Sequence, residues 1–486
     1  MIPARSAMTR VASITLHHSH PEWAARSLTS HAEGRWSRDQ RGILPAMRVI
    51  VVGAGAVGRT AVESLHEHHD CTVLDLDPAR LKEVSDALDV RVVRGDGAGR
   101  EALQAADVKR ADLVLACMPR AEANLVAAML VRRLSDARTV IRTGDTAYLD
   151  TWRSGDLDVD FIVSTEFQTA SAVARLVGVP GARQADFFLD GEVQVLQFDV
   201  SRREPPAFSG RPLAAAGLPR QSRVVGIVRD GNQVLPGAGE RLIAGDRVIV
   251  VASRSGAREW SRLLVRGDRV VSEAAIFGGT ELAVTVARVL IDRGIHVRLV
   301  ESDRQRAHEL ADRLDGARVF HASAFDRDFL RHERIAQATA AVFVLGDDAL
   351  SLYAAVLAKV NGAHSTVAVL VDPDAAEVFH AADVDSTIDP AAETAEVMVR
   401  FAHDPRTRQI AMLDEDRFEI LDIAVRGDSR LAGRPLSELP PTTSVIGAIV
   451  RDGGLLFPHG EQELRAGDRV IVLAERRRVG DVEQAL

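Results

Sequence analysis

A glycine-rich turn near the start of the chain has the residue types and spacing that hold the phosphates of a nucleotide. Gly53, Gly55 and Gly58 form a G-x-G-x-x-G pattern between the apolar run 48–52 and a segment with helical spacing. The first glycine permits the turn, the second lets a pyrophosphate approach the backbone, and the third lets helix and strand pack closely. The start of the helix offers free N–H groups to the phosphates. The residues predicted to line this crevice are Gly53, Ala54, Gly55, Ala56, Val57 and Gly58.

A carboxylate follows the turn at the position expected to hold a ribose. Asp75 ends the next apolar run, 71–74, and lies 17 residues beyond Gly58. A carboxylate there accepts hydrogen bonds from ribose hydroxyls and repels a 2′-phosphate, which disfavours NADP. Asp77 is a nearby competitor, but the strand ends more naturally at Asp75. The glycines, the acid and the strand-to-helix context together favour nucleotide binding over a packing role alone.

Four other polar residues lie beside the expected cleft. Asp96 closes the third predicted strand, 91–93, and could face the adenine end of a nucleotide. Arg142 ends the fifth strand and could either meet a phosphate or form a surface ion pair; both alternatives stay open. Glu122 and Asn124 begin a helix, where they could contact a ligand or a neighbouring subunit. Glu122 would also be favourable there on helix-dipole grounds alone.

A cysteine near the expected cleft and a cluster of histidines at the end of the first helix are interpreted as structural. Cys117 follows a strand, and the role of a small buried apolar residue is favoured over reactivity. His66, His68 and His69 lie near the end of the first helix without an acidic or cysteine partner at metal-ligand spacing. A solvated helix end is therefore favoured over a metal site. No catalytic residue and no metal ligand is predicted.

Bulk properties are typical of a soluble chain of several domains. At 486 residues the chain is too long for one compact core, and its 46% hydrophobic and 27% charged residues are ordinary for globular proteins. The net charge of −9 argues against a general affinity for nucleic acid. The chain has two cysteines and no apolar run of the roughly 18–20 residues that a membrane span needs. The sequence therefore predicts a cytoplasmic protein without a disulfide framework.

The chain contains an internal duplication. Three motifs occur twice in the same order, and the members of each pair are separated by 222 or 223 residues. Three matches in register indicate two homologous halves. The repeated pairs are 210–213 with 433–436, 227–231 with 449–453, and 244–250 with 466–472.

Each half opens with alternating strands and helices and ends in a smaller, strand-rich part. Such alternation predicts a doubly wound parallel sheet with right-handed crossovers. The fold class is therefore α/β, with two tandem Rossmann-like lobes, each followed by a small, β-rich α+β C-terminal lobe. The predicted segments are an N-terminal extension that is disordered or belongs to a wrongly assigned start (1–46), the first Rossmann-like lobe with its crossover (47–180), the first small lobe (183–268), the second, degenerate Rossmann-like lobe with its crossover (269–405) and the second small lobe (406–486).

The second half departs from the phosphate-binding pattern. Thr280 and Ala283 replace the second and third glycines, and a side chain at 280 would intrude where a pyrophosphate needs bare backbone. Glu301 could stand in for the ribose acid, but Ala322 and Ser323 replace the Gly-Asp pair of the first half. The second pocket is therefore predicted to be degenerate and mainly structural, and a different ligand is left open.

The order of these parts resembles that of the regulatory, TrkA-type subunits of Trk potassium-uptake systems. The resemblance rests on the opening 47–58, on 73–75, 91–96 and 122–124, and on the repeated A-G-D-R-V-I-V motifs; it covers residues 47–486. Members of that family carry two tandem regulator-of-potassium-conductance (RCK) domains, each with a Rossmann lobe and a small C-terminal lobe.

The resemblance implies a protein that senses NAD(H), or else ATP or ADP, and gates a membrane-embedded potassium-translocating subunit. Gly53, Gly55, Gly58, Asp75 and Asp96 would bind the nucleotide. The chains would form a homo-oligomeric ring, a tetramer of two-repeat chains, peripheral on the inner face of the cell membrane. Some relatives that respond to ATP carry an arginine inside the glycine turn, where this chain has an alanine, so the choice between NADH and ATP stays open.

Two other functions are weighed against this one. The small lobe also occurs in regulators of other channels and exchangers, and the sequence does not identify the membrane partner. A NAD-dependent oxidoreductase would need a general acid or base near the nicotinamide. The β-rich modules after the Rossmann lobes carry no His, Lys or Tyr constellation, and the aromatic content is 4%, so the chain is not expected to be an enzyme.

Overall fold

A computed structural model defines the fold over most of the chain. It describes residues 46–202, 205–234, 236–237, 239–264, 272–333, 340–402, 407–413, 418–436, 444–458 and 461–486. The predicted N-terminal extension, 1–46, lies outside these residues except for its last position. Within the described ranges, no helix is long and apolar enough to span a membrane.

The first half opens with a six-stranded parallel sheet flanked by helices. Its strands are β1 (Arg48–Val52), β2 (Asp70–Asp75), β3 (Arg91–Arg94), β4 (Leu113–Ala116), β5 (Arg138–Thr143) and β6 (Phe161–Ser164). Their order in the sheet is β3-β2-β1-β4-β5-β6, so the direction of winding reverses between β1 and β4, where open α/β sheets bind their ligands. The helices are α2 (Ala56–Leu65), α3 (Pro78–Ala87), α4 (Arg100–Ala105), α5 (Ala121–Leu134) and α6 (Ala147–Arg153).

Burial explains why these short runs form strands. β1 buries four of its five residues and β4 buries all four, as expected for strands that are covered by helices on both faces. The strands expected at 48–52, 71–74 and 91–93 are present, and their ends differ from the expectation by at most one residue.

The second half repeats this sheet. Its strands are β12 (Glu273–Phe277), β13 (His296–Glu301), β14 (Ala317–His321), β15 (Ala340–Phe343), β16 (Thr366–Val369) and β17 (Ser386–Ile388), in the order β14-β13-β12-β15-β16-β17. The helices are α9 (Glu281–Asp292), α10 (Arg304–Arg313), α11 (Arg327–His332), α12 (Asp348–Val360) and α13 (Ala376–Ala381). The predicted α/β class with two Rossmann-like lobes is confirmed.

A five-stranded antiparallel sheet follows each Rossmann-like lobe. The first has β7 (Gln184–Phe188), β8 (Val193–Asp199), β9 (Ser222–Arg229), β10 (Asn232–Val234) and β11 (Arg247–Ser253), with α8 (Arg254–Leu264). The second has β18 (Thr407–Leu413), β19 (Phe418–Ala424), β20 (Ser444–Arg451), β21 (Gly454–Leu456) and β22 (Arg469–Glu475), with α15 (Val479–Ala485). The two strand orders, β10-β9-β11-β8-β7 and β18-β19-β22-β20-β21, are the same order read from opposite edges. The predicted domain limits within the chain stay predictions.

The repeated motifs build equivalent parts of the two small lobes. Asp230 and the glycine after it have φ values of 48° and 74°, which suit the two-residue turn of the tight hairpin between β9 and β10. Arg229 donates from Nε and Nη2 to the two carboxylate oxygens of Asp246, at 2.8 Å each. Arg451 and Asp468 repeat this pair at 2.8 Å. The duplicated residues therefore maintain the turn and the ion pair of each small lobe.

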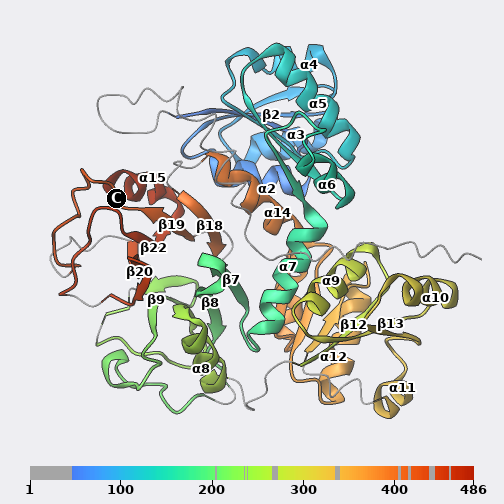
Figure 1. The fold of residues 1–486 in the computed structure, drawn as a ribbon, viewed down its shortest axis with the longest axis vertical. Helices are drawn as coiled ribbons and strands as arrows, with labels where there is room; N and C mark the ends of the chain where they lie inside the picture. Colours follow the sequence, from blue (N-terminus) through green and yellow to red (C-terminus); the bar gives the residue numbers. More distant parts are fainter. Residues whose placement is uncertain are drawn as a thin grey trace, which may run out of the picture. The chain divides into compact units, whose positions relative to one another are not determined.

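One helix of each half packs on the Rossmann-like lobe of the other half. α7 (Thr165–Gly178), which follows β6, packs against α9, β16 and β17. α14 (Pro390–Val399), which follows β17, packs against α2, β5 and β6. Figure 1 shows α7 beside α9 and α14 beside α2. The helix that follows the last strand of each parallel sheet, α7 or α14, thus packs on the Rossmann-like lobe of the other half. The sequence patterns did not indicate this exchange of helices.

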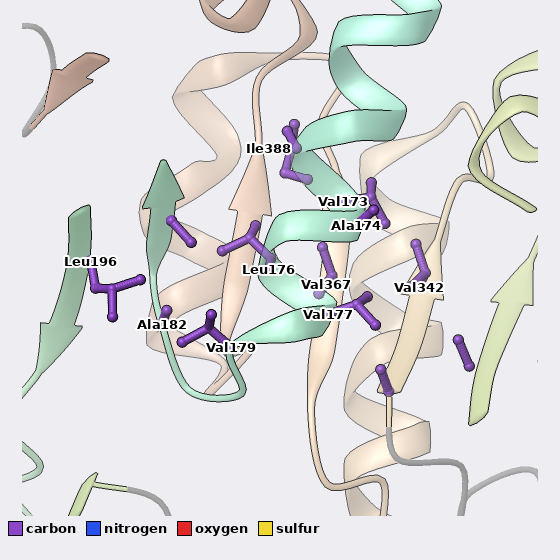
Figure 2. Packing of buried hydrophobic residues seen from close by; sticks show 14 of the residues in the cluster. Val173, Ala174, Leu176, Val177, Val179, Ala182, Leu196, Val342, Val367 and Ile388 are labelled. Atoms are coloured by element: carbon purple, nitrogen blue, oxygen red, sulfur yellow. The ribbon is translucent and has the colours of Figure 1, made fainter. Parts of the chain in front are cut away.

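Apolar side chains of α7 complete the core of the second lobe. Val173 and Val177 lie in one buried cluster with Val342, Val367 and Ile388, which come from β15, β16 and β17 (Figure 2). Burying a large aliphatic side chain contributes roughly 1.5–3 kcal/mol. The placement of α7 on the second lobe is therefore stabilised by the hydrophobic core of that lobe.

A buried ionic cluster lies where α7 meets α14. Arg175 Nη2 donates to Glu393 Oε2 at 2.6 Å and lies 3.4 Å from Asp186 Oδ1. Arg175 Nε donates to the carbonyl of Ala185 at 2.8 Å, and Gln184 Nε2 donates to Asp186 Oδ2 at 3.0 Å. Burial raises the pKa of Glu393 to about 7, although the Arg175 charge opposes the rise. α7, β7 and α14, from both halves of the chain, meet at this one guanidinium.

The two small lobes share a hydrophobic core of their own. One cluster of buried residues combines Ile249 of β11 with Ile420 of β19. The backbones approach closely there, because a Cβ at Gly447 would lie 2.4 Å from Cγ2 of Val251. The halves are therefore joined both through their crossover helices and through their small lobes.

Candidate functional site

The glycine turn joins β1 to α2 and has the conformation that its sequence predicts. Gly53 has φ +103°, a value that residues with side chains rarely adopt. Its N–H donates to the carbonyl of Leu74 at 2.7 Å, which fixes the turn against β2. A Cβ at Gly58 would lie 1.8 Å from the carbonyl oxygen of Gly53, so a side chain at 58 would push helix and turn apart.

The start of α2 is open. Gly55 is its N-cap residue, and among the described residues no side chain caps the N–H groups of the first turn. A Cβ at position 55 would meet one atom within 4 Å, Nη1 of Arg80 at 3.9 Å. Ala56 is exposed at the first helical position, whereas Ala54 and Val57 are buried. Bare backbone at the positive end of a helix fits a phosphate group.

The carboxylate of Asp75 lies beside this turn. Its Oδ2 accepts a hydrogen bond from the N–H of Ala54 at 2.6 Å, and its Oδ1 accepts one from the N–H of Asp77 at 2.8 Å. Asp77 itself caps α3 by accepting from the N–H of Ala79 at 2.8 Å. The structure thus brings Asp75 to the glycine turn and gives the competing acid a structural role.

Asp96 lies in the loop between β3 and α4, and its side chain is exposed. Its Oδ1 accepts a hydrogen bond from the N–H of Ala98 at 3.0 Å. A Cβ at Gly97 would lie 2.1 Å from Cγ1 of Val52, the last residue of β1. The loop therefore packs against the end of β1, at the same edge of the sheet as the glycine turn.

Asn124 joins two strand ends. Its fully buried side chain donates from Nδ2 to the carbonyls of Met118 and Arg142 at 2.9 Å each, and its Oδ1 accepts from the N–H of Met118 at 2.9 Å. These bonds use the side-chain amide for the fold, so the ligand or subunit contact left open for Asn124 is not supported. Glu122 stays exposed and accepts a hydrogen bond from the hydroxyl of Tyr148 at 3.2 Å.

Arg142, near the end of β5, is linked through the hydroxyl of Thr165 to α14 of the second half. Its Nε donates to the hydroxyl of Thr165 at 2.9 Å, and burial lowers its pKa. The Thr165 hydroxyl, at the start of α7, also accepts from the hydroxyl of Thr394 on α14 at 3.1 Å. The surface ion pair considered for Arg142 is absent from the described part of the chain. Thr394 is 229 residues from Thr165, so no local pattern could indicate this contact.

The last turn of α2 is tied to the second small lobe. Arg476 Nη1 donates to the carbonyl of Glu63 at 3.0 Å, and His68 Nε2 lies 2.9 Å from the carbonyl oxygen of Arg476. Near the other end of α2, the Sγ of Cys117 lies 3.8 Å from the Sδ of Met398 on α14. Cys117 is buried, which confirms its interpretation as a small buried apolar residue, and burial raises its pKa to about 12.

In the second half, side chains of the chain itself close the corresponding turn. Thr280 caps α9 by accepting from the N–H of Ala283 at 3.2 Å. Glu281, in the first turn of α9, accepts from Arg306 Nη2 and from Arg313 Nη2, both at 2.6 Å. Hydrogen bonds from these two guanidinium groups lower the pKa of Glu281 to about 2. A carboxylate of the chain itself thus lies at the start of α9. The equivalent helix start in the first half, that of α2, is open.

Glu301 holds the position of Asp75 in the second half. Its Oε1 accepts from the N–H of Asp303 at 2.7 Å, which repeats the bond between Asp75 and Asp77. A Cβ at Gly279 would lie 2.4 Å from Oε2 of Glu301. The longer acid therefore packs closely against its own turn.

Comparison with known proteins agrees with the duplicated two-lobe fold. Residues 49–165 and 274–390 each match the TrkA-N domain, and residues 200–265 and 420–486 each match the TrkA-C domain. The chain belongs to the TrkA family. Each TrkA-N match covers a Rossmann-like lobe, and each TrkA-C match covers most of a small lobe, so the resemblance drawn from the sequence is confirmed.

TrkA relatives match this chain over most of its length. A Trk system potassium uptake protein TrkA homolog from Archaeoglobus fulgidus is 28% identical over 441 residues, which cover 90% of this chain and 99% of the relative. The TrkA proteins of Halomonas elongata and Vibrio alginolyticus are 29% and 28% identical over 458 and 450 residues, covering 90% of this chain and 98% of each relative.

Solved structures share the fold of this TrkA-family chain. The RCK domain of GsuK matches with a TM-score of 0.55 at 16% identity, covering 96% of this chain and 100% of that one. The GsuK channel bound to NAD matches with a TM-score of 0.55 at 16% identity, covering 95% of this chain and 82% of that one. At this identity the likeness shows the tandem RCK fold.

Proposed function

We propose that this TrkA-family chain is a nucleotide-sensing regulatory subunit that gates a membrane potassium-uptake system from the cytoplasmic face. Its ligand is NAD(H) or a related adenine nucleotide, ATP or ADP, bound at the glycine turn of the first lobe. The relatives are named as Trk potassium-uptake proteins, and the similarly folded GsuK channel has a structure with NAD. Both names support the proposal.

The observation that carries the proposal is the contrast between two equivalent turns in one chain. The first turn of α2 begins after Gly55, without a side-chain cap in the described structure. The first turn of α9 is capped by Thr280, and Glu281 adds a carboxylate beside it. An external phosphate would give α2 what α9 receives from its own side chains, because helix N-termini favour anions. We therefore propose one competent site per chain, in the first lobe.

The residues at this site fit the parts of an adenine dinucleotide. Gly53, Gly55 and Gly58 would leave room for the pyrophosphate against the backbone. Asp75 would accept hydrogen bonds from the ribose hydroxyls, and Asp96 would lie toward the adenine. The nucleotide would supply negative charge and binding energy at this position.

A ligand bound there would act on the second half through direct contacts. α2 packs against α14, and its last turn is tied to Arg476. Arg142 reaches Thr394 of α14 through the hydroxyl of Thr165. A nucleotide that binds one arrangement of α2 and α14 more tightly shifts the equilibrium by that difference in binding free energy. This shift would change the shape of the ring, and the membrane partner would respond to that change.

The proposed ring, a tetramer of two-repeat chains, would assemble through α5 and α12. α5 exposes Val126 and Met129, with exposed fractions of 43% and 57%, and α12 exposes Tyr353 and Val360, with fractions of 58% and 71%. α5 and α12 follow the fourth strand of their respective sheets, so each chain presents two related apolar faces. Two such faces allow the first half of one chain to pair with the second half of the next around a closed ring.

Titration of the full chain with NADH, NAD, ATP and ADP by isothermal calorimetry tests the proposal. Asp75→Ala should weaken each ligand about 10- to 100-fold, because the ribose loses a charged hydrogen-bond acceptor. Gly55→Val should abolish binding, because its side chain would enter the open start of α2. Glu301→Ala, the matched change in the second half, should leave all affinities unchanged.

A folded wild-type chain that binds none of the four nucleotides would refute the sensing role. Turnover of NADH in a spectrophotometric assay would instead support the oxidoreductase alternative. Purification from a membrane extract identifies the partner: a potassium translocator supports the proposal, and another channel or an exchanger supports the other regulatory function.

A further inference from the structure

Arg80 lies at the open helix start but has no strong partner there. It belongs to the first turn of α3, and its Nη1 is the atom closest to the space that a Cβ at Gly55 would occupy, at 3.9 Å. Its Nε lies 3.7 Å from Oδ2 of Asp77, and both side chains are about half exposed. An exposed pair at that distance contributes little free energy. The Arg80 guanidinium is therefore available to a ligand at the glycine turn.

The second half shows what the corresponding arginine does when an anion is present. Arg306 follows Glu301 by five residues, as Arg80 follows Asp75. Its Nε donates to the carbonyl of Gly279 in the turn at 2.9 Å. Its Nη2 donates to Oε1 of Glu281 at 2.6 Å. The arginine thus lies across the turn and binds a carboxylate at the start of the helix.

Glu281 acts as an anion supplied by the chain itself. It is the first residue of α9, and Ala56 is the first residue of α2. Ala56 carries no charge, so the first half lacks this internal partner. Arg313, the second guanidinium on Glu281, lies seven residues after Arg306; the residue seven positions after Arg80 is Ala87. The second half therefore has two arginines and a carboxylate at its turn. The first half has one arginine, Arg80, and neither the carboxylate nor the second arginine.

We infer that Arg80 closes over the glycine turn and binds a phosphate of the adenine nucleotide, in the way that Arg306 binds Glu281. The inference rests on the proposed function and names the residue that recognises the diphosphate. A guanidinium suits this role because its planar fork donates two hydrogen bonds to a phosphate. Glu281 fills the equivalent place in the second half, which excludes a phosphate there.

Calorimetric titration of the full chain with ADP and with adenosine tests this inference. Arg80→Met should weaken ADP binding about 10- to 100-fold, as expected for a lost hydrogen bond to a charged group, and should leave adenosine binding within about twofold. Arg306→Met is the matched control and should leave both affinities unchanged. Arg80→Lys should recover part of the lost affinity, because it keeps the charge but loses the fork.

A second variant places the anion of the second half into the first. Ala56→Glu introduces an exposed acid in the first turn of α2, which is compatible with the helix dipole, so the chain should fold. It should weaken ADP binding at least about tenfold, because its carboxylate would pair with Arg80 and occupy the phosphate position.

Three results would overturn the inference. ADP binding to Arg80→Met at wild-type affinity would remove Arg80 from the site, and an equal loss for adenosine and ADP would place it on the base or sugar. Full ADP affinity in Ala56→Glu would place the phosphate elsewhere. Each of these results leaves wild-type nucleotide binding intact, whereas a wild-type chain that binds no nucleotide refutes the proposed function itself.

Discussion

Replacing Arg175 should destabilise the contact between the two halves of the chain. Its guanidinium is the counter-ion that the buried carboxylates of Glu393 on α14 and Asp186 on β7 share. Arg175→Met keeps most of the side-chain volume but leaves Glu393 and Asp186 without their counter-ion. The exposed fractions of these two acid side chains are 19% and 4%. Removing one partner of a buried ion pair costs about 3–5 kcal/mol, so we expect destabilisation of that size above neutral pH.

The cost should depend on pH in a defined direction. The folded chain raises the pKa of Glu393 from its ordinary 4.5 to about 7, first through burial. Folding therefore favours the protonated acid, and the stability from this group is present below about pH 4.5 and is lost as the pH rises through about 7. At pH 5 Glu393 is already protonated in the folded chain, so the loss of Arg175 should cost less than at pH 8, because one of its two acidic partners is neutral there.

Urea denaturation followed by circular dichroism at pH 5 and pH 8 measures this difference. The midpoint for Arg175→Met should fall more at pH 8 than at pH 5, and the added Glu393→Gln change should recover part of the loss at pH 8. Midpoints are compared because a chain of several lobes need not unfold in two states. Equal shifts at both pH values, or no recovery in the double variant, would show that charge burial is not what the arginine compensates.

Two further predictions follow from the site and the exposed faces. Asn124→Ala should lower the free energy of unfolding by about 2–4 kcal/mol, because the buried hydrogen bonds to Met118 and to the carbonyl of Arg142 are lost. Ser351→Ala is the control, since its buried hydroxyl has no hydrogen-bond partner in the described structure. An equal effect of the two changes in thermal melts would contradict a stabilising role for the Asn124 hydrogen bonds. Met129→Glu on α5 and Tyr353→Glu on α12 should each reduce the mass measured by multi-angle light scattering, whereas Arg110→Glu on a polar, exposed turn should not; an unchanged mass would exclude these faces from the ring.

The sequence predicted the parts of the site that depend on neighbours along the chain. The turn was predictable because the positive φ of Gly53 favours glycine directly after a strand, and Gly55 follows at the spacing of the phosphate-binding pattern. Asp75 was predictable because it ends the next parallel strand, which lies beside β1 in any sheet of this order. The duplicated motifs were visible because the hairpin turn and the Arg229–Asp246 pair impose the same residues on both small lobes.

The sequence patterns gave no sign of contacts between elements that are far apart in the chain. Arg142 was a candidate for either a phosphate contact or a surface ion pair, and in the structure its Nε donates to the hydroxyl of Thr165, which begins α7. Asn124 looked like a possible ligand contact, but it is a buried clamp. Arg80 was not predicted as a site residue. Its role is inferred from the observed contacts of Arg306, the arginine at the equivalent position of the second half.

The sequence by itself determined two Rossmann-like lobes, two small lobes and one intact glycine turn, because strand periodicity, turn conformation and helix starts are properties of short segments. The tertiary structure decided that α7 and α14 exchange lobes, that Arg175 is shared between both halves, and that Glu281 fills the second turn. The physical reason is that an amphipathic helix encodes an apolar face but not the sheet it covers. Which sheet that is depends on the packing of the whole chain.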